Sequence, residues 1–168
     1  QISLRGVQTL VVSSDSQLTA PLKGGGPNPS CANAEQRAPA GPENQNMVGL
    51  LTTFGTFSFL NLIDLDWQKE VELACPVDRL GPVTIYQTSR HGSFDGAGAP
   101  AFLGAIKPQV AVFNNGPRKG LGQLDDRIVR PAGSPARYER NAFARLSAVP
   151  GIEGIWQGHL SLLDSDPS

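Results

Sequence analysis

The segment MVGLLTTFGTFSFLNLIDLDW, residues 47–67, decides the fold class of this chain. It contains two apolar runs, 47–55 and 56–64, and the Gly55-Thr56 pair between them is typical of the turn of a β-hairpin. The second run leads directly into a helical pattern that begins at Asp66, a residue type that often caps a helix N-terminus. The segment therefore predicts a hairpin whose second strand continues into a helix.

Strands and helices alternate along the rest of the chain. The predicted strands are 2–14 (one strand or a pair), 82–89, 109–115 and 154–163, and the predicted helices are 66–75, 99–107 and 134–149. Asp66 and Ser134 are the predicted N-caps of the first and last helices, and Glu70 and Glu72 are predicted to face solvent. This order predicts a layered α+β or α/β fold, with residues 1–168 in one domain.

The composition bounds the kind of protein. With 39% hydrophobic residues and a formal net charge of −1, the chain of 168 residues can bury a core but has no basic field that would attract nucleic acid or an anionic membrane. No apolar run approaches the roughly 18–20 residues that span a bilayer. Residues 17–46, rich in Gly and Pro, lack helical and strand periodicity and are predicted to form one long loop.

The N-terminus and the two cysteines bear on where the protein folds. The sequence starts at Gln1 rather than Met and has no signal-peptide pattern, so we expect a processed, trimmed or fragmentary product and leave an upstream targeting segment open. We favour an extracytoplasmic location over a cytoplasmic one. Cys31 and Cys75 have no CxxC spacing, which argues against a structural zinc site. Two states stay open for them: a disulfide that ties the long loop to the sheet, or two half-buried thiols.

Polar residues follow two of the predicted strands, at the place where layered α/β proteins usually carry their sites. Asp64 and Asp66 follow the strand 56–64, and His91, in SRHGS, follows the strand 82–89. From local pattern alone, the two aspartates are turn and cap residues as readily as ligands. A single histidine at a strand end is more often structural than a metal ligand.

Two further polar groups accompany them. The turn NNGPRKG (114–120) could bind a substrate or a phosphate, although a plain turn is the favoured interpretation. The second histidine, His159, alternates with Gln157 and Ser161 and is predicted to be structural or to support a ligand. The sequence contains no phosphate-binding P-loop, no dinucleotide fingerprint and no nucleophile elbow.

An ordered series of segments resembles a known family. The segments are GPENQNMVGLLTTFGTFSFLNLIDLDWQKEVELACP, VTIYQTSRHGS, PAFLGAIKPQVAVFNNGPRKG and PGIEGIWQGHLSLL. Together they resemble the C-terminal half of metallo-β-lactamase-fold hydrolases, both an uncharacterised bacterial branch and the hydrolase domain of competence-type DNA-uptake proteins. The resemblance implies half of an αβ/βα sandwich, a partial domain that pairs with the missing N-terminal half or with a second copy.

The resemblance also implies a metal site. Asp64 matches the metal-bridging carboxylate of the family and His91 matches its last metal-binding histidine, which implies two zinc ions in the intact domain. Such ions activate water to cleave an ester, amide or phosphodiester-type bond in a substrate. Ile63 and Arg90 stand where the family has a glycine and a further histidine, and the family motif His-x-His-x-Asp-His does not occur in this chain.

Supporting roles are assigned around this pair of ligands. The residues expected on the substrate side are Asn114, Asn115, Arg118 and Lys119, and those expected to support the ligands are Asp66, Arg90, Ser93 and His159. Two interpretations of function compete. The first is part of a di-zinc hydrolase, and the alternative is a degenerate, non-catalytic α/β binding module that has lost its metals.

Overall fold

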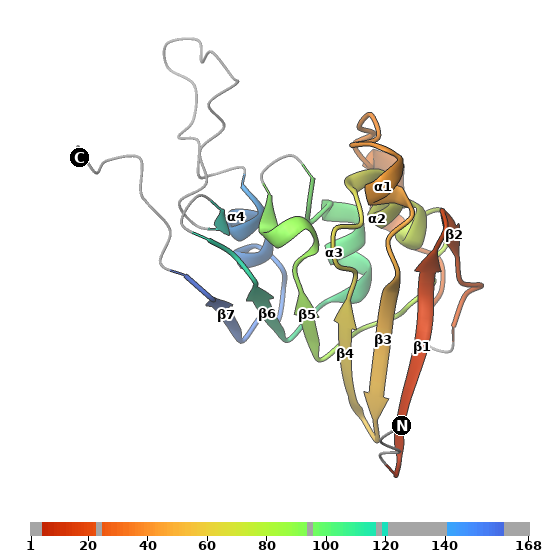
Figure 1. Cartoon of the computed structure of the whole chain (residues 1–168), viewed down its shortest axis with the longest axis vertical. Helices are drawn as coiled ribbons and strands as arrows, with labels where there is room; N and C mark the ends of the chain where they lie inside the picture. Colours follow the sequence, from red (N-terminus) through yellow and green to blue (C-terminus); the bar gives the residue numbers. More distant parts are fainter. Residues whose placement is uncertain (1–4, 23–24, 94–95, 117–118, 121–140, 160–168) are drawn as a thin grey trace.

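The computed structural model describes residues 5–22, 25–93, 96–116, 119–120 and 141–159 of the chain. Within this part, seven strands form one sheet in the order β2-β1-β3-β4-β5-β6-β7 (Figure 1). The strands are β1 (Val7–Ser14), β2 (Gln17–Leu18), β3 (Gly49–Phe54), β4 (Phe57–Asn61), β5 (Ile85–Gln87), β6 (Val110–Phe113) and β7 (Gly154–Gln157). Pairing is antiparallel from β2 to β4 and parallel from β4 to β7, so the sheet is mixed.

The predicted hairpin over 47–64 forms β3 and β4. Phe54 pairs with Phe57 across a two-residue turn, and Gly55 has a φ of 57° there. A tight hairpin turn needs a left-handed residue, which glycine supplies without steric cost. The hairpin joins the antiparallel side of the sheet to its parallel side.

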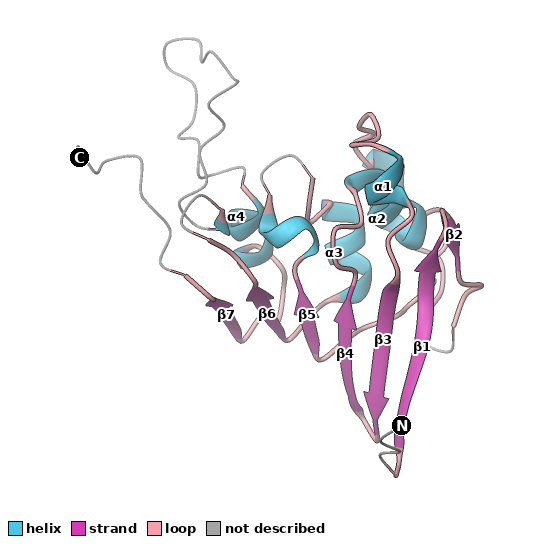
Figure 2. Ribbon diagram, viewed as in Figure 1, coloured by secondary structure: helices cyan, strands magenta, loops and turns pink. Residues whose placement is uncertain are grey.

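The described residues also form four α-helices and two short 3₁₀-helices. They are η1 (Pro29–Asn33), α1 (Pro42–Gln45), α2 (Trp67–Ala74), η2 (Ser89–Gly92), α3 (Pro100–Ile106) and α4 (Ala142–Ser147). Because β4 to β7 are neighbours in sequence order, right-handed crossovers place α2, α3 and α4 on one face of the sheet. Figure 2 shows these helices grouped on one side, with the strands in front of them.

The core lies between the sheet and this helical layer. Leu51, Leu60, Tyr86 and Ala111 occupy paired positions on β3 to β6, and all four are buried. The ring of Tyr86 meets the ring of Phe102 on α3 edge-on, with the centroids 5.5 Å apart. The period of two along each strand thus turns one row of side chains toward the helices.

No described element covers the opposite face of the sheet. We call this surface the open sheet face; its apolar residues are Val7, Val11, Leu50, Phe54, Phe57, Phe59, Ile85, Val110, Val112 and Trp156. Val11, Phe54, Phe57 and Trp156 are 50%, 58%, 41% and 69% exposed, and the others are half-buried. A contiguous apolar surface of this kind is typical of an interaction site.

Residues 17–46, predicted to form one long loop, are mainly loop but contain three short elements. The segment contains β2, η1 and α1. Its Asn28 side chain caps η1 by accepting a hydrogen bond from the N–H of Ser30 and donates to the carbonyls of Ala74 and Ala101. Hydrogen bonds to distant backbone groups order this segment, and such contacts leave no periodic signal in the sequence.

The last helix and the last strand are shorter than predicted. The helix begins at Ala142, because the side chain of Asn141 accepts a hydrogen bond from the N–H of Ala144 and caps it. Ser134, the predicted cap, lies outside the described residues, as does the segment 160–163 of the last predicted strand. Strand β7 ends at Gln157.

The chain is therefore a mixed α/β protein with a seven-stranded sheet, in agreement with the broad α+β class predicted. Among the described residues, no helix combines the length and the apolarity that crossing a membrane requires.

Candidate functional site

The ends of three parallel strands bring the predicted metal ligands together. Asp64 follows β4, His91 follows β5 and Asn114 follows β6. The Nε2 atom of His91 lies 3.5 Å from Oδ1 of Asp64, and its Nδ1 atom lies 2.7 Å from the carbonyl oxygen of Asn114. The side chains of His91 and Asp64 are 44% and 37% exposed, so the pair is open to solvent and to a ligand.

The hydrogen bond to Asn114 determines the state of the imidazole. A carbonyl oxygen only accepts, so Nδ1 of His91 carries the proton and donates it to Asn114. In the neutral ring, Nε2 then holds the lone pair, and it points toward Asp64. Metal-binding histidines are usually oriented by this kind of contact at the other ring nitrogen.

The backbone around the pair is strained. Ile63, Arg90 and His91 have φ values of 54°, 48° and 57°, in the left-handed region that a β-branched residue such as isoleucine rarely adopts. The N–H of Arg90 donates to the carbonyl of Ile63 at 2.8 Å, which ties the two strained turns together. Strain of this kind costs about 1–3 kcal/mol per residue and gathers at functional sites.

The other left-handed residues that are not glycine, within the described part of the chain, have ordinary explanations. Asp15 and Ser16 form the turn between β1 and β2, and Lys107 ends helix α3. Half of the left-handed positions therefore lie at Asp64 and His91, where Ile63 belongs to the turn between Leu62 and Leu65 and Arg90 and His91 belong to η2.

Gly92 is required by the packing of the same turn. Its φ is 72°, and a Cβ atom there would collide with the ring of Phe113. The hydroxyls of Thr88 and Ser93, on either side of η2, are buried and have no hydrogen-bond partner. Unsatisfied buried groups are uncommon in native structures. The turn that carries His91 therefore combines a left-handed backbone with two buried hydroxyls that lack a hydrogen bond.

Asp66 caps helix α2 and is not a ligand of the pair. Its two carboxylate oxygens accept hydrogen bonds from the N–H groups of Lys69 and Ala40, at 3.0 and 3.2 Å, and the side chain is buried. The turn and cap interpretation was correct for Asp66. At the start of the neighbouring turn, the Asn61 side chain accepts from the N–H of Ile63, and the carboxylate of Asp64 faces Nε2 of His91.

The residues predicted on the substrate side have different places in the structure. Asn115 is buried, and its amide donates to the carbonyls of Gly116, Lys119 and His159, so it holds the loop together. Asn114 is exposed next to His91, and Lys119 donates through Nζ to the carbonyl of Arg90. Arg118 lies outside the described residues.

The residues predicted to support the ligands act mainly through the backbone. The carbonyl of Arg90 accepts from the N–H of Ser93, and the guanidinium of Arg90 lies against Gly96. His159 is held at its backbone by Asn115 and does not join the pair of ligands.

Glu70 is a buried carboxylate that was not predicted from the sequence. Glu70, on α2, was predicted to face solvent but has no exposed surface. It accepts hydrogen bonds from the hydroxyl of Tyr86 and from the N–H of Ala99, both at 2.8 Å. Burial raises the pKa of Glu70, and these hydrogen bonds partly oppose that rise. The prediction that it faces solvent rested on its place in a short helix close to Glu72. No local sequence pattern distinguishes a buried glutamate from an exposed one.

The pair of Asp64 and His91 fits a zinc ion in part. A tetrahedral zinc ion with bonds of about 2.1 Å holds its ligand atoms about 3.4 Å apart, close to the distance between Nε2 and Oδ1. Within the described residues, however, no group of three His, Cys, Asp or Glu side chains could hold a metal ion. The described chain thus offers two ligands and does not complete a site.

Cys31 and Cys75 form a disulfide that joins η1 to the end of α2. Of the two states left open by the sequence, the structure contains this one. It lies in the helical layer and makes no contact that would place it at the pair of Asp64 and His91.

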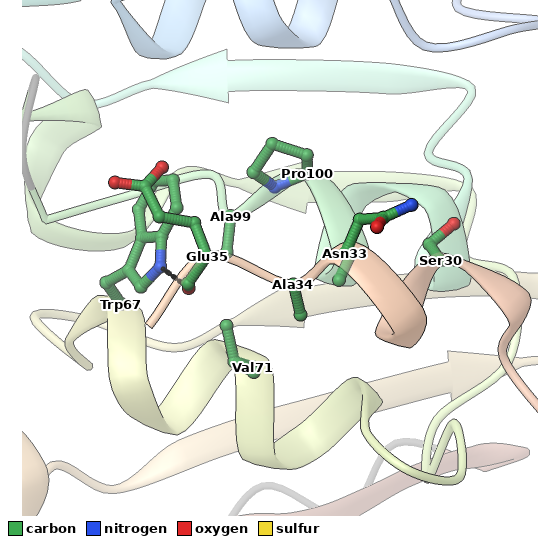
Figure 3. A pocket seen from close by; sticks show the side chains of 9 residues that line it. Ser30, Asn33, Ala34, Glu35, Trp67, Val71, Ala99 and Pro100 are labelled. Atoms are coloured by element: carbon green, nitrogen blue, oxygen red, sulfur yellow. Dashed lines mark hydrogen bonds between the residues drawn. The ribbon is translucent and has the colours of Figure 1, made fainter. Parts of the chain in front are cut away.

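A separate cavity of about 400 Å³ lies in the helical layer (Figure 3). Its lining residues are Ser30, Asn33, Ala34, Glu35, Trp67, Val71, Ala99, Pro100 and Ala101. The indole N–H of Trp67 donates to the carbonyl of Glu35 at 2.8 Å, and the guanidinium of Arg37 lies 3.5 Å from the centre of the indole ring. Because Trp67 is only 2% exposed, little of its ring is left for a ligand.

Comparison of the chain with protein-family models, with curated proteins and with solved structures finds no match in any of the three.

Proposed function

We propose that this chain is part of a metal-dependent hydrolase and that Asp64 and His91 are two ligands of its zinc site. The observation that carries the proposal is the 3.5 Å approach of Nε2 of His91 to Oδ1 of Asp64, with Nδ1 fixed on the carbonyl of Asn114. The strained turns that carry both residues support it, because such strain gathers where a protein needs one particular geometry.

The proposal assigns a role to each residue at the ends of β4, β5 and β6. Asp64 and His91 hold the ion, and Asn114 orients the imidazole through its carbonyl. Zinc bound there would supply Lewis-acid activation of water and of the bond to be cleaved. The exposed side chain of Asn114 and the ammonium of Lys119 are proposed to contact the substrate, an ester, an amide or a phosphodiester.

The remaining ligands are proposed to come from a partner of this chain. The open sheet face would be the inner surface of an αβ/βα sandwich of the metallo-β-lactamase type, and the missing N-terminal half would cover it. The half-buried apolar residues of that face support a partner sheet. A second zinc ion in the intact domain belongs to the same proposal, since two protein ligands cannot hold two ions.

A non-catalytic binding module is the second candidate. The described residues offer only two ligands, and Arg90 occupies the position next to His91 where the family has a further imidazole. A guanidinium cannot ligate a cation and adds positive charge beside the pair. A chain that had lost its metals would keep the fold and the open sheet face.

A zinc titration followed by NMR tests the proposal. The chain has only two histidines, so labelling with ¹⁵N-histidine gives one ring signal set for His91 and one for His159. We expect Zn²⁺ to move the His91 signals, and we expect His91→Ala and Asp64→Asn to abolish or weaken zinc binding while the matched control His159→Ala keeps it.

Two results would contradict these assignments. If Zn²⁺ leaves the His91 signals unchanged in the protein assembled with its partner, or binds His91→Ala as tightly as the wild type, the ligand assignment is wrong. If zinc binds at His91 but the protein assembled with its partner hydrolyses no ester, amide or phosphodiester, the hydrolase is wrong and the binding module is favoured.

A further inference from the structure

We propose that Glu70 and Tyr86 are positioning residues that hold both ends of the loop 89–99, and so set the geometry of His91. His91 lies near the start of this loop, and neither Glu70 nor Tyr86 touches it. The consequence for zinc binding rests on the proposed function, but the effect on the His91 ring does not depend on a metal.

The first end of the loop is held through Tyr86. The hydroxyl of Tyr86 donates to Oε1 of Glu70 at 2.8 Å and accepts from the N–H of Ser89 at 3.0 Å. The hydroxyl of Ser89 lies 3.0 Å from the same phenol oxygen. All three side chains are fully buried, so water does not compete for these contacts.

The second end of the loop is held by Glu70 directly. Its Oε2 atom accepts from the N–H of Ala99 at 2.8 Å. Arg145, on α4, donates to the carbonyls of Gly98 and Ala97 at 2.9 and 2.7 Å and reinforces the same end. One carboxylate on α2 therefore binds Ala99 directly and Ser89 through Tyr86, at the two ends of the connection between β5 and α3.

These hydrogen bonds hold the segment directly beside the residues with a left-handed backbone. Ser89 comes directly before Arg90 and His91, whose left-handed conformations persist only if the surrounding structure enforces them. The hydrogen bond from the N–H of Ser89 to Tyr86 fixes the entry to that turn, and the hydrogen bond from the N–H of Arg90 to Ile63 fixes the next peptide. Loss of the first contact is expected to let the turn relax and to move Nδ1 of His91 away from Asn114.

A core made only of apolar residues would not need this carboxylate. The network satisfies donors at Tyr86 and Ala99 and, through the phenol oxygen, at Ser89. Each of these donors belongs to the loop 89–99 or to the strand that leads into it, and none belongs to the remote parts of the core. The network therefore serves the loop that carries His91.

The variant Tyr86→Phe tests the inference, since it removes one hydroxyl and keeps the ring that packs on Phe102. Histidine ring ¹⁵N signals report the tautomer. In the wild type we expect His91 to be the Nδ1–H tautomer; in Tyr86→Phe we expect a mixture of tautomers, and about a tenfold weaker affinity for Zn²⁺. Glu70→Gln is the second variant, because it keeps the size of the side chain but cannot accept both hydrogen bonds.

The matched control is Thr84→Val. Thr84 lies at the other end of β5 and its hydroxyl bonds to Ser58, so the variant also loses one hydroxyl beside the same strand. We expect its His91 signals and its zinc affinity to match those of the wild type. We expect its unfolding midpoint in urea to fall, as for Tyr86→Phe.

The outcomes separate the inference from the proposed function. If a folded Tyr86→Phe or Glu70→Gln protein keeps the His91 tautomer of the wild type, the positioning role is wrong. If the tautomer changes but the wild type binds no zinc, the positioning role stands and the metal site fails. If Thr84→Val changes the His91 signals equally, the effect is general destabilisation and the inference is overturned.

Discussion

The carboxylate of Glu70 lies beneath the loop that carries His91, with no exposed surface. Burial of a carboxylate costs several kcal/mol, and hydrogen bonds to a charged group each return about 1.5–3 kcal/mol. With Tyr86 and Ala99 as donors the hydrogen bonds return less than burial costs, so the folded protein binds a proton at Glu70 more readily than the unfolded chain does. This is the physical meaning of the raised pKa of Glu70.

The raised pKa predicts how stability depends on pH at this residue. The stabilisation from a protonated Glu70 is complete below the ordinary pKa of the residue, 4.5, and is lost as the pH rises through the higher pKa of the folded state. Gln does not titrate. We therefore expect Glu70→Gln to be less stable than the wild type by about 1–3 kcal/mol near pH 4, and the difference to shrink toward pH 8.

Urea denaturation of both proteins at several pH values measures this difference. Other acids titrate equally in the two proteins and cancel. A difference that grows as the pH rises would mean that the pKa of Glu70 is lowered rather than raised in the folded protein.

At the scale of elements, the helical layer is tied to the segment 17–46 by the disulfide between Cys31 and Cys75. The bond joins η1 to the residue that ends α2, and Asn28 adds hydrogen bonds from the same segment to α2 and α3. Disulfides persist in oxidising compartments, which fits the favoured extracytoplasmic location. These bonds fix the segment against helices α2 and α3, and α2 also carries Glu70.

Removal of this disulfide is expected to destabilise the protein. Closure of a loop whose ends are 44 residues apart is worth about 2–4 kcal/mol of folding free energy. We expect the double variant Cys31→Ala/Cys75→Ala to unfold at a lower urea concentration by that amount, while the His91 ring signals stay those of the wild type, because the bond lies in the helical layer. A stability within 0.5 kcal/mol of the wild type, about the scatter of a surface substitution, would contradict this expectation.

At the scale of the whole molecule, one face of the sheet is covered and the other is open. The covered face carries the core and its three crossover helices, and the open sheet face carries half-buried and exposed apolar side chains together with polar ones such as Thr52 and Asn61. Exposed apolar sheet surfaces associate readily, because association removes that surface from water. The chain without its proposed partner is therefore expected to bind a second copy of itself.

Light scattering coupled to size-exclusion chromatography tests this expectation. We expect a mass above that of the monomer that falls on dilution, and we expect Val112→Lys, on β6 of the open sheet face, to give a monomer. Val77→Lys is the control, since Val77 is 37% exposed but lies in the loop after α2. A wild type that stays monomeric at high concentration, or a control that dissociates like Val112→Lys, would contradict a role for this face.

Local signals in the sequence predict the longer elements of this protein and most of their order. Apolar runs around Gly55 predicted the hairpin, and the cap at Asp66 predicted the start of α2, because both signals come from residues that are neighbours in the chain. The same local signals were silent about segment 17–46, which is ordered by contacts of Asn28 and Cys31 with residues more than forty positions away.

Only the tertiary structure decided which of these residues act together. Asp64, His91 and Asn114 follow different strands, and the parallel register of β4, β5 and β6 brings them to one edge. Glu70 has the local pattern of a solvent-facing helix residue, yet the folded chain buries it with Tyr86 and Ala99 as its hydrogen-bond donors. Burial and hydrogen-bond partners depend on segments distant in sequence, so a periodic pattern can predict a helix but not which acid the folded chain will bury.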